Sequence, residues 1–162
     1  MKRLFTCLFL FVTAVVPVIA QKTDAQKNDE SLIKTLIETE TQAWQKRDAV
    51  VLLNCWANVS YASQLVSLQD GQVITFTNAK LDLSKHAQLM MDGLGKANSA
   101  KFENKDYLIH INGNAAWVTF NQTNTGLEDK ATRAYATRYL ERMNGGWQIV
   151  HIGTVFYKPT EK

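Results

Sequence analysis

The chain has 162 residues, of which 46% are hydrophobic and 20% charged, and its formal net charge is +3 at pH 7. Two of the 18 basic residues, Lys2 and Arg3, lie at the extreme N-terminus, so residues 21–162 carry a net charge of only +1. A nearly neutral chain with dispersed charges gives no electrostatic basis for binding nucleic acid.

The first twenty residues are typical of a secretory signal peptide. Lys2 and Arg3 precede an apolar run over residues 4–16, and small residues occupy the positions that a signal peptidase reads before and at Ala20. An uncleaved membrane anchor is the alternative, but the run is shorter than the roughly 20 residues that a stable span needs. We expect cleavage after Ala20 and a secreted or periplasmic protein with no membrane association afterwards.

Cleavage leaves enough chain for one domain with its own core. Cys7 is removed with the signal, so Cys55 is the one cysteine that remains, and neither an internal disulfide nor a cysteine-based metal site is possible. Cys55 lies in an apolar run over residues 50–56, which favours a buried thiol over a nucleophile.

Helices are expected early in this domain. Residues 21–28 are polar and predict a disordered leader. Apolar residues then recur at three- and four-residue spacing, which predicts an amphipathic helix over residues 30–46. Asp48 is expected to cap a second, short helix that reaches Trp56.

Strand patterns dominate the rest of the chain. A short first strand is expected over residues 57–62 and a β-prone run over 73–76, and Ser84 is expected to cap a third helix over 84–93. Four longer strands follow, over residues 101–111, 115–124, 131–142 and 147–157. Helices first and a long antiparallel meander last indicate an α+β fold in one domain, over residues 29–158.

The C-terminal hairpin carries a family signal. Asn144-Gly145-Gly146 separates two β-prone runs as a tight turn, and Trp147 opens the returning strand. This pattern resembles the closing hairpin of the nuclear-transport-factor-2-like superfamily, which includes the SnoaL-like polyketide cyclases and the ketosteroid isomerases. The resemblance implies a cystatin-like cone, in which N-terminal helices pack on a strongly bent, mainly antiparallel sheet that encloses a pocket.

Arg138 is expected to lie in that pocket. Thr137-Arg138 and the run over 147–151 resemble the end of the association domain of calcium/calmodulin-dependent kinases, whose equivalent arginine points into the pocket and can bind small carboxylates. Strand parity supports the assignment independently, because Arg138 shares its face with Ala136 and Leu140. Pairing with an internal Asp or Glu is the alternative, since a buried arginine needs either an acid or a ligand.

The superfamily's enzymes suggest catalytic candidates. Tyr61 stands where the ketosteroid isomerases carry their catalytic Asp, and a tyrosine there is a poor base at neutral pH but can donate a hydrogen bond. The resemblance also places His86 near a pocket histidine, so His86 with Tyr61 could act as acid and base, as in scytalone-dehydratase-like enzymes. The expected ligand-binding set consists of Arg138 for the anionic group, Trp56 as a wall, and three polar contacts: Gln122, His86 and Tyr61.

The histidines do not form a metal motif. No two of His86, His110 and His151 lie on one helical turn, and no acidic ligand accompanies them. We expect no metal and no cofactor.

Three functions remain open: a secreted domain that binds a small organic molecule with an anionic group, a lyase or isomerase of the SnoaL-like or scytalone-dehydratase-like type, and a homo-oligomeric assembly module whose pocket is vestigial. Tyr135, Thr137 and Tyr139 share the other face of their strand, with Trp117 and Thr119 beside them. An aromatic sheet face needs a cover, and superfamily members often dimerise through it, so we expect a homodimer.

Overall fold

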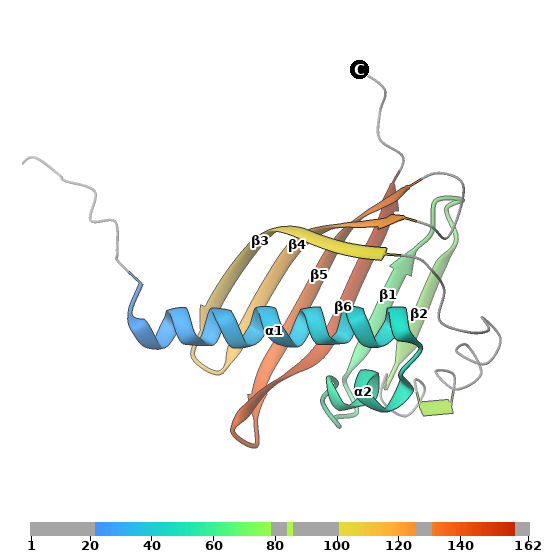
Figure 1. Cartoon of the computed structure of the whole chain (residues 1–162). Helices are drawn as coiled ribbons and strands as arrows, with labels where there is room; N and C mark the ends of the chain where they lie inside the picture. Colours follow the sequence, from blue (N-terminus) through green and yellow to red (C-terminus); the bar gives the residue numbers. More distant parts are fainter. Residues whose placement is uncertain (1–21, 79–83, 86–100, 126–130, 158–162) are drawn as a thin grey trace, which may run out of the picture.

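Two helices pack on one face of a curved six-stranded sheet in the computed structural model, which describes residues 22–78, 84–85, 101–125 and 131–157 (Figure 1). The helices are α1 (Asp24–Lys46) and α2 (Ala49–Asn54). The strands are β1 (Ser63–Ser67), β2 (Val73–Thr77), β3 (Lys101–Asn112), β4 (Ala115–Thr125), β5 (Thr132–Met143) and β6 (Gly146–Tyr157). Their order in the sheet is β2-β1-β6-β5-β4-β3, and every pair is antiparallel except β1 with β6. The predicted α+β class and bent sheet are confirmed.

Helix α1 begins earlier than the sequence pattern indicated. Thr23 and Gln26 form a capping box, in which the Thr23 hydroxyl accepts from the Gln26 backbone N–H at 3.3 Å and the Gln26 side chain accepts from the Thr23 backbone N–H at 3.0 Å. The helix therefore includes residues 24–28, where the polar composition predicts a disordered leader, so that prediction is wrong for these residues. Asp48 caps α2 as expected, by accepting from the Val51 N–H at 3.0 Å.

The predicted strand over residues 57–62 is wrong. The chain after α2 instead forms a parallel bridge to β6: Ala57 N–H donates to the Ile149 carbonyl at 2.8 Å, and Ile149 N–H donates to the Cys55 carbonyl at 2.9 Å. A turn follows, and β1 starts only at Ser63. The bridge uses Cys55, Trp56 and Ala57, so only the first residue of the predicted strand pairs with β6 there, and the regular pairing begins several residues later.

The long strands agree with the predicted runs to within a few residues, and so does the closing turn. Asn144 has φ 52° and Gly145 has φ 83°, the two positive values that a type I′ hairpin turn requires. The β-prone run predicted over residues 73–76 is also confirmed, since it forms β2. Most of the predicted helix over 84–93 lies outside the described residues. Only its first two residues, 84 and 85, are described, and both are helical.

The core lies between α1 and the inner face of the sheet. Its largest fully buried side chains belong to Trp56, Phe120, Ile33, Ile37, Leu140, Ile149 and Val118. Ala134, Ala136 and Arg138 are buried on the same face of β5, which confirms the parity argument for Arg138. Within the described part of the chain, no helix is both long and apolar enough to cross a membrane.

Candidate ligand-binding pocket

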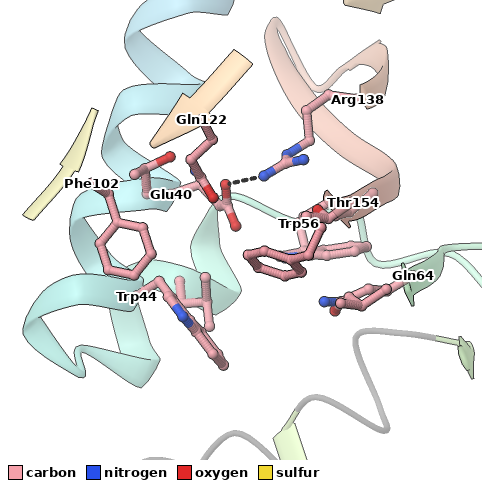
Figure 2. Close-up of a pocket in the computed structure, with 13 residues that line it drawn as sticks. Glu40, Trp44, Trp56, Gln64, Phe102, Gln122, Arg138 and Thr154 are labelled. Atoms are coloured by element: carbon pink, nitrogen blue, oxygen red, sulfur yellow. Dashed lines mark hydrogen bonds and ion pairs between the residues drawn. The ribbon is translucent and has the colours of Figure 1, made fainter. Parts of the chain in front are cut away.

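A cavity of about 130 Å³ opens between the C-terminal half of α1, helix α2 and the inner face of the sheet (Figure 2). Its apolar lining consists of Trp44, Leu52, Trp56, Val66, Phe102, Ile152 and Phe156. Its polar lining consists of Glu40, Thr41, Gln64, Gln122, Arg138 and Thr154. A dry cavity of about 150 Å³ takes a benzene ring, so this space suits a single ring.

An ion pair forms part of the cavity wall. Arg138 Nη2 donates to Glu40 Oε2 at 3.0 Å, and the two side chains are only 5% and 10% exposed (Figure 2). Arg138 Nη1 also donates to the Thr137 carbonyl at 3.0 Å, and the guanidinium lies 5.1 Å from the centre of the Phe120 ring. The Nε–H of Arg138 is buried and has no hydrogen-bond partner among the described residues.

Sequence reasoning did not identify Glu40, although a signal for it was present. Glu40 lies three residues after Ile37 and seven after Ile33, so it falls on the buried stripe of the helix. A charged residue on an apolar helical face is rarely buried without a partner. The alternative left open for Arg138, pairing with an internal acid, is the arrangement in the structure.

A second set of hydrogen bonds holds the other polar wall. Gln122 Nε2 donates to Asn104 Oδ1 at 2.9 Å, and Asn104 Nδ2 donates to Thr41 Oγ1 at 3.0 Å. These contacts tie β4 and β3 to α1. Gln122 therefore occupies a fixed position at the cavity wall, beside Glu40 in Figure 2.

The structure brings together three of the predicted site residues, Arg138, Gln122 and Trp56, all of which line the cavity. Tyr61 does not line it. Because β1 starts at Ser63 rather than at residue 57, Tyr61 lies before the strand, is 57% exposed, and donates to Glu141 Oε2 at 2.9 Å. That hydrogen bond, with some desolvation, raises the pKa of Tyr61, so the hydroxyl is an even poorer base.

His86 lies outside the described residues. His151 is on the outer face of the sheet, where its Nδ1 lies 2.8 Å from Ser63 Oγ. Burial and, secondarily, the charge of Arg138 lower the pKa of His151, which keeps the ring neutral at pH 7.

Cys55 is a buried thiol, as its apolar surroundings suggested. It donates to the Val51 carbonyl at 3.3 Å, and burial, with a smaller effect of the Glu40 charge, raises its pKa to about 12. A thiol so far from ionisation is not a nucleophile at neutral pH. The described residues contain no group of three or more His, Cys, Asp and Glu side chains placed to hold a metal ion.

Comparison with known proteins places the fold and the family. The family model described as the SnoaL-like domain matches residues 33–154. A solved NTF2-like protein of unknown function from Pseudomonas putida superposes with a TM-score of 0.66 at 23% identity, over 83% of this chain and 89% of that chain. A protein of unknown function with a cystatin-like fold from Nostoc punctiforme superposes with a TM-score of 0.61 at 17% identity, over 87% of this chain and 97% of that chain. A search of curated proteins finds no match.

Proposed function

This chain belongs to the SnoaL-like domain family, and from that premise we propose that it binds a small organic molecule in the cavity between α1 and the sheet. The family includes lyases and isomerases as well as ligand-binding members. One observation carries the proposal: a cavity with apolar, largely aromatic walls also contains a buried ion pair and an anchored glutamine. Apolar walls with a few placed polar groups are the usual composition of a small-molecule site.

The same geometry favours binding over acid–base chemistry. Glu40 and Arg138 are the charged side chains among the described residues that line the cavity, and they are bonded to each other. Tyr61, one of the two expected catalytic residues, lies outside the cavity. A general acid or base must come within hydrogen-bond reach of the substrate, which Tyr61 cannot do from its position.

A fragment panel tests the binding proposal. Single-ring compounds with one polar substituent are expected to bind with dissociation constants in the micromolar to millimolar range, since so few atoms limit the affinity. Trp44 and Trp56 line the cavity, so quenching of tryptophan fluorescence reports occupancy.

The matched variants are Val66→Trp, which places a large ring inside the cavity, and Val73→Trp, which adds the same ring at an exposed position on β2. Val66→Trp should abolish binding and Val73→Trp should leave it unchanged. Equal binding by both variants, or no binding by the wild type, would contradict the proposal.

Homodimerisation through the outer face of the sheet is a second proposal. Trp117 and Tyr135 are 46% and 47% exposed on neighbouring strands of that face. Arg133 and Glu141 lie on the same face of β5, four residues on either side of Thr137. A two-fold axis that crosses β5 at Thr137 would set Arg133 of one copy against Glu141 of the other, which favours a second copy as the cover.

Charge reversal tests this arrangement. Arg133→Glu is expected to weaken dimerisation at least about tenfold, because it opposes two carboxylates at each end of the interface. The double variant Arg133→Glu/Glu141→Arg should restore the dimer, since it exchanges the two charges. Sedimentation equilibrium measures both. A wild-type monomer at micromolar concentration, or no recovery in the double variant, would refute this interface.

A further inference from the structure

We propose that Glu40 makes the cavity selective for uncharged ligands, so that it accepts a single-ring molecule bearing a carboxamide or another neutral carbonyl group and excludes the corresponding carboxylate. This inference rests on the proposed function, ligand binding in the same cavity. It differs from the anionic ligand that the kinase association domains suggest, and the difference arises from one residue on α1.

The charges of the described lining residues cancel. Glu40 and Arg138 supply one negative and one positive charge at a separation of 3.0 Å, in side chains that are 10% and 5% exposed. A carboxylate that entered would be attracted by Arg138 and repelled by Glu40 at similar range. It would also lose its hydration. A buried carboxylate is stable only beside a cation whose charge no other group already neutralises.

A neutral carbonyl group matches the hydrogen-bonding capacity that remains. Arg138 donates to the Thr137 carbonyl from Nη1 and to Glu40 from Nη2. Each of these nitrogens carries two hydrogens, so these two bonds leave one N–H on each for a further acceptor. An unsatisfied buried donor gains from any acceptor, charged or not. A carbonyl oxygen can accept from this side chain without displacing Glu40, and it brings no net charge into the cavity.

The remaining walls suit the ring that would carry such a group. Three aromatic side chains, Trp44, Trp56 and Phe102, present their rings to the cavity (Figure 2). Aromatic side chains pack well against an aromatic ligand in offset or edge-to-face geometry. Gln122 also lines the cavity and lies beside Glu40 in Figure 2, where an amide group of the ligand would reach it.

The test compares matched acid and amide pairs, benzoate with benzamide and nicotinate with nicotinamide, at pH 7.5 by calorimetry. Wild-type protein is expected to bind each amide at least about tenfold more tightly than its acid, a factor that corresponds to about 1.4 kcal/mol. Glu40→Gln keeps the shape and the acceptor oxygen but removes the charge. It should reverse the order, because Arg138 then offers an uncompensated cation to the carboxylate.

Glu38→Gln is the matched control, since Glu38 lies on the same helix and accepts from the Tyr107 hydroxyl at 2.6 Å but does not line the cavity. It should leave the preference for amides unchanged. Equal or tighter binding of the acids by the wild type would overturn the inference while pocket binding stands. If the wild type binds neither the acids nor the amides, and so behaves like Val66→Trp, the proposed function itself is overturned. The wild-type comparison needs no variant, so it decides the matter even if Glu40→Gln fails to fold.

Discussion

Replacement of Arg138 by Met is expected to lower the free energy of unfolding by about 3–5 kcal/mol, because it leaves the Glu40 carboxylate buried without its cation. The variant also loses the contact between the guanidinium and the Phe120 ring. Urea denaturation measures the loss, and an unchanged slope with urea concentration shows that the folded state is otherwise intact.

Two further variants show whether the loss comes from the stranded charge. Glu40→Leu/Arg138→Met removes both charges and is expected to be as stable as the wild type or more so, since an apolar pair of similar volume often replaces a buried ion pair without cost. Arg142→Met breaks the more exposed pair with Asp29 and should cost about 1 kcal/mol or less. A loss below about 1 kcal/mol for Arg138→Met would mean that Glu40 is not held as a buried carboxylate.

The sequence allowed the sheet and one side of the cavity to be predicted, because both depend on local periodicity. Alternation along residues 131–142 and the turn at Asn144 and Gly145 define the register of the last hairpin, and parity then assigns Arg138 to the inner face. The partner of Arg138 could not be predicted in the same way. Glu40 is 98 residues away along the chain, so only the packing of α1 on the inner face of the sheet brings the two together.

The placement of Tyr61 failed for a related reason. Residues 57–62 alternate as a strand would, and no local feature shows that the chain after α2 pairs first with Ile149 of β6. That long-range bridge delays β1 to Ser63 and leaves Tyr61 on the surface. The start of a short strand depends on which neighbour is available, which one sequence does not encode locally.

Trp56 is the residue at which fold and cavity depend on each other most closely. Its side chain is 1% exposed, its backbone bridges to Ile149, and its ring lines the cavity beside Arg138 (Figure 2). Trp56→Ala is expected to lower the free energy of unfolding by about 3–5 kcal/mol, through loss of buried contacts that the backbone bridge does not replace. Trp44→Ala, at a half-buried position of the same cavity, should cost about 1–2 kcal/mol.

Although Trp56→Ala should be less stable than the wild type, it should bind a larger ligand. Removing a ring that already faces the cavity extends that space instead of creating a separate void, so the variant should accept a two-ring amide such as 2-naphthamide that the wild type excludes. Calorimetry with benzamide and 2-naphthamide, on protein first shown to be folded by circular dichroism, measures both effects. If Trp56→Ala loses stability but gains no affinity for the larger amide, the ring supports only the core, and the ligand must contact other walls of the cavity.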